Sequence, residues 1–516
     1  MSNKEQHSVT KSRHIAQNSI LLFVRMFMIM VINLYAVRII LKGLGESDYG
    51  TFNAVAGVVL SSTVLTTSLA IAIQRFFSHA MGEKDYDRLN EIFSASMNII
   101  FIVSILVIVI LETVGLWFLN SQLSIPADRI IAANWVYQFS LFSFLLSLLQ
   151  LPYTAAIFSH EDMGYFALIS FLESLFKLIV AIFITMVPID YLVYYGAGLA
   201  TVSVLVFAMY FGVARVKYSE CRYGKVTDKT IYPLLASFSG WTMYGALAGV
   251  ATTQGNTILL NVFFGPLTTT AFAISLQISH AFQALSNSII LAFRPAMIKS
   301  YAEKDHRNLD FLFDASNKIL LYLMVCVSVP IVFEIRTIFI WWLGVVSEET
   351  ILFARLFIVY IILLTLHNPI TTIVQATGNV KKYTLVVESI MLLCLLLAFV
   401  AFKSGCPSYY AIVSLIVVTI LAHVLRLVLL HRQYPSYPIG QYLWSFIMPG
   451  TAVIALAIGM TSMIHFRTDN VLTRFMTVFT LSPTITLCLA YFLGISRQEK
   501  LRIRQFVQQL LKHYGL

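Results

Sequence analysis

Polar and charged side chains interrupt the apolar stretches of this sequence at a few positions. His280, Gln283, Asn287 and Arg294 are four of them, and at 100° per residue they fall within a narrow arc of one helix. Polar groups are costly against lipid, so such a stripe is expected to line a cavity. Hydrogen bonding between neighbouring helices is the alternative, and it is common in membrane bundles. We favour a cavity lining, because a stripe with a His and an Arg exceeds what helix association needs.

Arg25 lies near the middle of the first apolar stretch, with Asn18 and Asn33 near the same helical face. An arginine at that depth costs about 2.5 to 3.5 kcal/mol on insertion scales. We therefore expect it to face water, an acidic side chain or an anionic ligand. Its planar guanidinium suits phosphate oxygens. A buried ion pair with Glu173 or Glu388 is the alternative.

Two acidic residues are candidates for coupling transport to an ion. Glu173 and Lys177 stand four residues apart with the acid first, so they can pair with each other. Glu388 has no such local partner and is the best candidate for a protonatable group. A structural partner for Glu388 on another helix is the alternative.

Aromatic side chains stand among small residues on the seventh stretch. Trp241 and Tyr244 are spaced by three positions, on a face with Ser237, Ala248 and Thr252. A sugar ring could stack on either aromatic side chain. Ordinary packing of helices on small residues explains the same pattern.

These side chains are positioned by about fourteen apolar stretches of roughly 20 to 28 residues. A bilayer core about 30 Å thick needs about 20 apolar helical residues per crossing. The composition agrees, with 58% hydrophobic and 12% charged residues and a mean hydropathy of +0.81. The sequence therefore predicts an all-α polytopic membrane protein with little chain outside the bilayer.

The net charge of +10 does not indicate nucleic-acid binding. Lys and Arg concentrate in alternate connections, such as Arg215 to Lys229, and outer connections carry few of them. This is the distribution that the positive-inside rule describes. It places both termini in the cytoplasm, and the surplus positive charge attracts anionic membrane lipids.

The two halves of the chain resemble each other. A shift of 220 positions gives about thirteen identities over about 55 residues, including Glu83-Lys84-Asp85 with Glu303-Lys304-Asp305 and Gly45 with Gly265. The same shift places Gln283, Asn287 and Arg294 on another polar set. This set comprises Thr63, Thr67 and Gln74.

Six crossings separate the two copies, so both run in the same direction through the membrane. Parallel repeats predict two lobes around a central cavity. We expect an amino-terminal lobe at 1–230, a carboxy-terminal lobe at 231–434, and an added helix pair with a basic tail at 435–516.

Catalytic motifs are missing from the sequence. It lacks Gly-x-Ser-x-Gly, a Walker loop and His-Glu-x-x-His. The five cysteines contain no Cys-x-x-Cys pair, so no metal site is indicated, and we expect no cofactor. The outer loops are about ten residues or shorter, which leaves no room for an extramembrane catalytic domain. We therefore expect a transporter rather than an enzyme.

The twin lobes, the added helix pair and the basic central link resemble the multidrug/oligosaccharidyl-lipid/polysaccharide (MOP) exporter superfamily. Within it, the chain is most similar to the polysaccharide-biosynthesis flippases of O-antigen or capsule repeat units. The run Gly45-Glu46-Ser47-Asp48-Tyr49-Gly50 is similar to that family's Gly…Tyr-Gly turn. The related drug exporters often carry an acidic residue in their first helix, and this chain has none there.

The resemblance implies an inner-membrane flippase that moves an undecaprenyl-diphosphate-linked oligosaccharide to the periplasmic leaflet by alternating access. The family's cationic cavity maps onto Arg25, with Arg294 and Arg75 at the cytoplasmic mouth. A polysaccharide polymerase and a chain-length regulator are the implied protein partners. Two other functions stay open: an ion-coupled drug or metabolite exporter, and a polytopic polysaccharide polymerase or ligase.

Overall fold

The computed structural model describes the backbone of residues 3–500 except 84, 161, 345, 378–379 and 497–498. Side chains are described from residue 28 onward, apart from 82–83, 241–242, 291–292, 295 and 380. Within these residues every regular element is a helix, and twelve helices are long and apolar enough to cross a membrane. The predicted all-α polytopic fold is confirmed, and the count of fourteen is approximate. One reason is that α1 (Asn3–Leu60) joins the first two predicted crossings.

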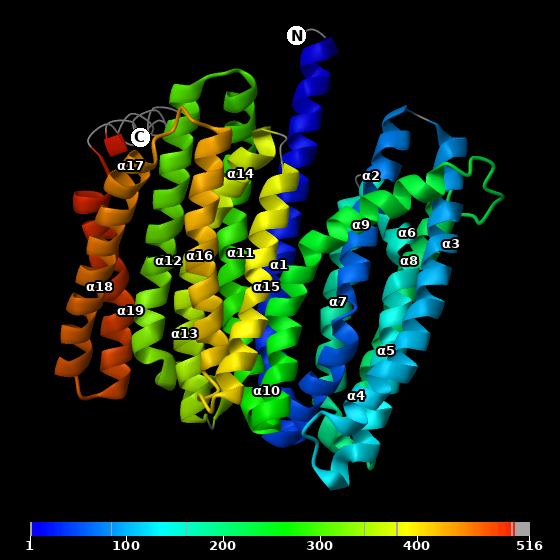
Figure 1. Cartoon of the computed structure of the whole chain (residues 1–516), viewed down its shortest axis with the longest axis horizontal. Helices are drawn as coiled ribbons and strands as arrows, with labels where there is room; N and C mark the ends of the chain where they lie inside the picture. The colour runs from blue at the N-terminus through cyan, green and yellow to red at the C-terminus, as the bar shows by residue number, and fades with distance from the viewer. Residues whose placement is uncertain are drawn as a thin grey trace. The chain divides into compact units, whose positions relative to one another are not determined.

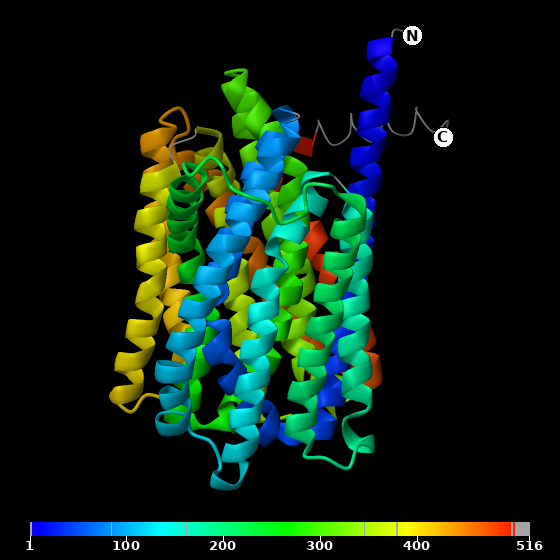
Figure 2. The same ribbon diagram turned by 90° about the vertical axis from the view of Figure 1, so that its right-hand side faces the viewer.

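The chain forms two compact units, and in each the long helices run roughly side by side (Figures 1 and 2). Unit 1 comprises Met1–Ile274 and Leu395–Ala411, and unit 2 comprises Ser275–Cys394 and Ile412–Leu516. The lobe borders at residues 230 and 434 stay predictions, because a unit defined by contacts need not move as one body.

Unit 1 is built from the first ten α-helices, the start of α11 (Pro266–Ala302) and the end of α15 (Val380–Lys403). α5 packs on α8, α1 packs on α7 and α5, and α2 packs on α6 and α9. Their bounds are α1 (Asn3–Leu60), α2 (Thr63–Glu83), α3 (Tyr86–Ile110), η1 (Leu111–Gly115), α4 (Leu116–Ser121), η2 (Ala127–Arg129), α5 (Ile130–Leu149), α6 (Leu151–Ser159), α7 (Met163–Ile182), η3 (Ile184–Met186), α8 (Tyr191–Lys217), α9 (Ile231–Val250), η4 (Ala251–Gly255) and α10 (Asn256–Phe264).

Ion pairs and a buried hydroxyl hold unit 1 together where its helices are irregular. Arg129 bridges the Gly45–Gly50 turn to the start of α8, with Nε 2.8 Å from Asp48 Oδ1 and Nη2 3.1 Å from Asp190 Oδ1. The fully buried Tyr137 donates to the carbonyl of Leu111, where α3 changes into a π-helical turn. A π-turn leaves backbone groups that a side chain can satisfy.

The internal repeat is visible in the backbone. Gly45 and Gly265 both have positive φ, 78° and 84°, which glycine adopts without steric cost. Asp85 caps α3 by accepting from a backbone N–H at 3.0 Å, and Asp305 caps α12 (His306–Leu343) in the same way at 3.1 Å. Each shared residue therefore serves the same local purpose in its own copy.

Unit 2 is organised around α12, which packs on α13, α18 and α19. α12 kinks beyond Pro330, a residue that cannot donate to the helical ladder. The helices of this unit are α11 (Pro266–Ala302), α12, α13 (Glu348–Thr365), α14 (His367–Thr377), α15 (Val380–Lys403), α16 (Tyr410–Gln433), α17 (Ile439–Tyr442), η5 (Leu443–Ile447), α18 (Met448–Arg467), α19 (Val471–Leu489) and η6 (Ala490–Gly494).

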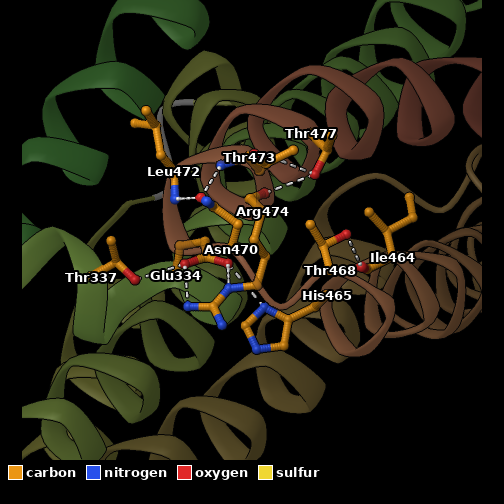
Figure 3. A network of polar contacts seen from close by, with 10 residues as sticks. All are labelled: Glu334, Thr337, Ile464, His465, Thr468, Asn470, Leu472, Thr473, Arg474 and Thr477. Carbon is orange, nitrogen blue, oxygen red and sulfur yellow. Dashed lines mark hydrogen bonds and ion pairs between the residues drawn. The ribbon is translucent and has the colours of Figure 1, made fainter.

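The added helix pair, α18 and α19, is joined to α12 by buried polar contacts (Figure 3). The Glu334 side chain is fully buried at the kink of α12 and lies 2.9 Å from both Arg474 Nε and His465 Nδ1. Thr337 donates to the second carboxylate oxygen at 2.8 Å. Nearer the N-terminal end of α12, Lys318 lies 2.9 Å from Glu499. These contacts make the pair an integral part of unit 2.

Candidate functional site

Unit 1 encloses a cavity of about 660 Å³ between α1, α2, α5, α7 and α8. Phe52, Phe139 and Phe144 form its aromatic walls. Its polar walls are formed by side-chain hydroxyls and one amide. These are Thr63, Thr66, Thr67, Ser140, Ser143, Ser147, Gln150 and Ser203. A volume of this size lies within the range of about 300 to 1,000 Å³ that small-molecule sites occupy.

The hydroxyls of this cavity are poised to accept hydrogen bonds. Ser143 Oγ donates to the carbonyl of Phe139 at 2.8 Å, and Thr67 Oγ1 donates to that of Thr63 at 3.0 Å. Ser203 does the same with Leu199 at 3.0 Å. A hydroxyl whose proton is engaged by its own helix keeps its lone pairs for a ligand. The cavity wall therefore offers acceptors to a ligand that is rich in donors.

Lys177 is the charged side chain among the described residues that line the cavity. Its ammonium lies 2.6 Å from the Glu173 carboxylate one turn away on α7. The local pairing of these residues is therefore observed. An ammonium has three donors, so Lys177 can still donate to a ligand while it holds Glu173.

The predicted polar set of Thr63, Thr67 and Gln74 lies in two different environments in the structure. Thr63 and Thr67 line the cavity, with α5, α7 and α8 as the opposite wall. Gln74 and Arg75 are exposed nearer the C-terminal end of α2, and the Arg75 guanidinium lies 4.4 Å from the ring centroid of Phe238 on α9. The break between α1 and α2 at residues 61–62 falls beside Thr63.

Two other residues predicted in unit 1, Asn33 and Tyr244, do not line this cavity. Asn33 is exposed and Tyr244 is half-buried. The side chains of Arg25, Asn18 and Trp241 lie outside the described residues. Their assignment to a substrate site stays a prediction.

The predicted stripe on α11 follows one face of a continuous helix. His280, Gln283 and Asn287 are exposed, whereas Phe282 and Ser286 on the adjoining face are buried. A hydrogen bond joins α11 to α14 here, in which Asn368 of α14 donates to Ser286 Oγ at 3.0 Å. Helix association thus uses a different face of α11 from the stripe.

Arg294 extends the stripe and is half-buried. Its Nε is buried and has no hydrogen-bond partner among the described residues. An arginine donor in that state is available to an anionic group.

Glu388, the predicted coupling residue, lies on α15 in unit 2 and is half-buried. The charge of Arg426 on α16 acts on it, although no ion pair within 4.0 Å joins the two in the described chain. Sequence reasoning did not select Arg426. Its spacing of three residues from His423 on one helical face was the available signal.

The described residues hold no group of three or more His, Cys, Asp or Glu side chains arranged for a metal ion. Among the described residues, no hydrogen bond joins a serine or threonine of the cavity of unit 1 to Lys177. What its walls can do chemically is bind a ligand through hydroxyl acceptors, one ammonium and aromatic faces.

No protein-family model and no curated protein matches this chain. Its fold is similar to the lipid II flippase MurJ in an inward closed conformation, with a TM-score of 0.71 and 14% identity, covering 91% of this chain and 98% of that one. It is also similar to an inward-facing multidrug resistance MATE transporter of the MOP superfamily (TM-score 0.66, 13% identity, 81% and 99% covered). A eukaryotic MATE transporter gives 0.57 and 14% identity, with 83% and 97% covered. The chain shares the fold of these transporters, and its place among the polysaccharide flippases stays a prediction.

Proposed function

We propose that this protein is a flippase, and that it moves a lipid-linked oligosaccharide from the cytoplasmic to the periplasmic leaflet by alternating access. The observation that carries the proposal is a fold shared with a lipid flippase over 91% of the chain, together with a hydroxyl-lined cavity in unit 1. The chemistry of the walls supports a saccharide as part of the substrate.

A saccharide matches the cavity of unit 1 in three ways. Its hydroxyls donate to the oxygens of side chains such as Ser143 and Thr67, whose own protons are engaged by the helices. Its apolar faces pack on rings such as Phe139. Lys177 donates to the sugar or to its anionic substituents.

The diphosphate of the substrate requires cationic donors elsewhere. Arg294 has a buried and unpartnered Nε among the described residues, at the end of the exposed stripe on α11. Arg25 is proposed for the same role from its depth in the first crossing. Bidentate guanidinium contacts suit phosphate oxygens, and membrane burial strengthens them.

The competing function is ion-coupled export of a drug or metabolite, which the similarity to a multidrug MATE transporter keeps open. An organic cation would be attracted by an unpaired carboxylate in its cavity. Here the charged lining residue is Lys177, and the neighbouring Glu173 is already paired with it. The charge pattern therefore favours a neutral or anionic ligand. A polymerase or ligase is a further alternative, and the described chain offers it no catalytic group in this cavity.

The proposal is tested in proteoliposomes that carry a fluorescent prenyl-diphosphate oligosaccharide, with a membrane-impermeant quencher reporting its leaflet. Ser143→Phe fills the cavity and is expected to reduce flipping at least tenfold. Arg25→Ala and Arg294→Ala are expected to abolish it. The matched controls, Thr113→Phe and Arg432→Ala, alter exposed residues and should flip at the native rate.

Folding is checked for each variant by monodispersity in detergent. Native flipping by both Ser143→Phe and Arg294→Ala would refute the proposed substrate site. Extrusion of organic cations by the native protein, with no lipid flipping, would establish the exporter instead. Inner-membrane location, cytoplasmic termini and association with a polymerase and a chain-length regulator belong to the same proposal.

A further inference from the structure

A buried arginine in unit 2 has more donors than partners. Arg426 lies on α16 with 5% of its surface exposed. Arg426 interacts electrostatically with the hydroxyl of Tyr383 on α15, which itself lies 2.9 Å from Thr371 Oγ1. Its Nε and Nη1 are buried and have no hydrogen-bond partner in the described chain. Unsatisfied donors of a buried charge are costly, so this arginine requires an acceptor.

Two imidazoles accompany Arg426. His423 lies one turn earlier on α16, and His367 begins α14. The charge of Arg426 acts on both rings. The Nδ1 atom of each ring is buried without a hydrogen-bond partner among the described residues. His423 Nε2 lies 3.2 Å from the hydroxyl of Tyr442, so when that hydroxyl donates, Nδ1 carries the proton and is a further donor.

His367 lies at an irregular point of one membrane span, Glu348–Thr377. α13 ends at Thr365 and α14 begins at His367, but Leu366 between them keeps helical φ and ψ of −63° and −19°. The backbone is therefore nearly continuous here, and the donors available at this place are side chains.

Glu388 is the acidic residue that shares this environment, and it is not paired with Arg426 within 4.0 Å in the described chain. A cluster is therefore formed by Arg426, His367, His423 and Tyr383. It carries one positive charge and, among the described residues, several donors without hydrogen-bond partners, and the nearby Glu388 carboxylate forms no ion pair with Arg426. Water could satisfy the donors but would leave the charge uncompensated. A small anion satisfies both.

We propose that the cluster of Arg426, His367, His423 and Tyr383 binds a chloride-sized inorganic anion inside unit 2. Glu388 competes with this anion, because an anion at Arg426 and a charged carboxylate beside it repel each other. Neutralising Glu388 therefore favours the anion. The proposal does not depend on what the protein transports.

The experiment measures binding of radioactive chloride to the purified full-length protein in detergent, with gluconate as the counter-ion. Native protein is expected to bind chloride saturably, and bromide is expected to displace it. Arg426→Met should weaken binding at least tenfold and His423→Phe should weaken it severalfold. Glu388→Gln should tighten it severalfold, which a merely structural role for Glu388 does not explain.

Two matched controls should bind like the native protein. Arg432→Met alters an exposed arginine of the same helix, and Glu173→Gln alters an acidic residue of unit 1 that is paired with Lys177. The absence of saturable chloride binding would overturn the proposal in favour of water. Binding that survives Arg426→Met would place the anion elsewhere. If Arg426→Met does not fold, Glu388→Gln decides, because weaker binding in that variant contradicts the competition.

Discussion

Removal of Arg474 from α19 leaves the Glu334 carboxylate without its cationic partner inside unit 2. The Glu334 side chain is fully buried, and Arg474 is 23% exposed. The two residues therefore differ in how well each tolerates the loss of the other. An isolated Arg474 can extend its long side chain towards solvent, whereas Glu334 has no such route.

The expected magnitudes follow from this asymmetry. Breaking a buried pair by removing one partner costs about 3 to 5 kcal/mol of folding free energy, so Arg474→Met should lie in that range. Glu334→Gln keeps the size of the side chain and one oxygen for His465, but its amide nitrogen cannot accept from Thr337, so it should cost about 1 to 3 kcal/mol. The double variant should cost less than the sum of the two, because the residues are in contact.

The assay is thermal unfolding of the purified variants, followed by size-exclusion monodispersity at increasing temperature. Arg336→Gln is the matched control on the same helix, because its ion pair with Glu348 is exposed and is expected to contribute about 0 to 1 kcal/mol. If the Arg474→Met variant is as stable to heat as the Arg336→Gln variant, the reasoning is refuted. Full additivity in the double variant would show that the two residues are not coupled.

Three further predictions concern unit 1 and the repeat. Gly50→Ala should destabilise the protein by about 1 to 3 kcal/mol or more, because its Cβ would lie 1.9 Å from a backbone oxygen, whereas Gly164→Ala meets no atom within 4 Å and should be neutral or stabilising in thermal unfolding. Asp85→Ala and Asp305→Ala should each cost about 1 kcal/mol through loss of the equivalent helix caps, measured in the same way. Burial alone would raise the pKa of Asp162, but hydrogen bonds from Lys217 and Tyr218 outweigh it and lower this pKa. A lowered carboxyl pKa stabilises the folded state above the unfolded pKa of about 3.9, and this contribution is lost as the pH falls through the folded-state pKa. Asp162→Asn should therefore lower the melting temperature at neutral pH, and the difference from the native protein should narrow in acid.

Much of the local structure could be predicted because it depends on contacts within one helix or turn. Gly45 and Gly265 end a helix with positive φ in both copies of the repeat. Lys177 pairs with Glu173, as their spacing of four residues indicated. Such features need only neighbours that the chain itself supplies.

The candidate site was predicted less completely. Thr63 and Thr67 were predicted to line a cavity between two lobes; they line a cavity within unit 1, and their role in binding a substrate stays a prediction. Ser143 and the other hydroxyls of α5 and α8 were missed, because isolated serines in apolar helices usually bond to their own backbone and carry no periodic signal. Arg426 was missed for a related reason, since its burial depends on α14 and α15 packing around it.

The sequence by itself determined that this chain is a bundle of membrane helices with an internal repeat, because hydrophobic length and repeated residues are properties of the order of amino acids. Only the tertiary structure decided which polar residues meet. The Glu334 network joins residues more than 130 positions apart, and no periodicity along the chain encodes such a contact. Side chains on different helices become neighbours through packing, and packing depends on the shapes of all the helices at once.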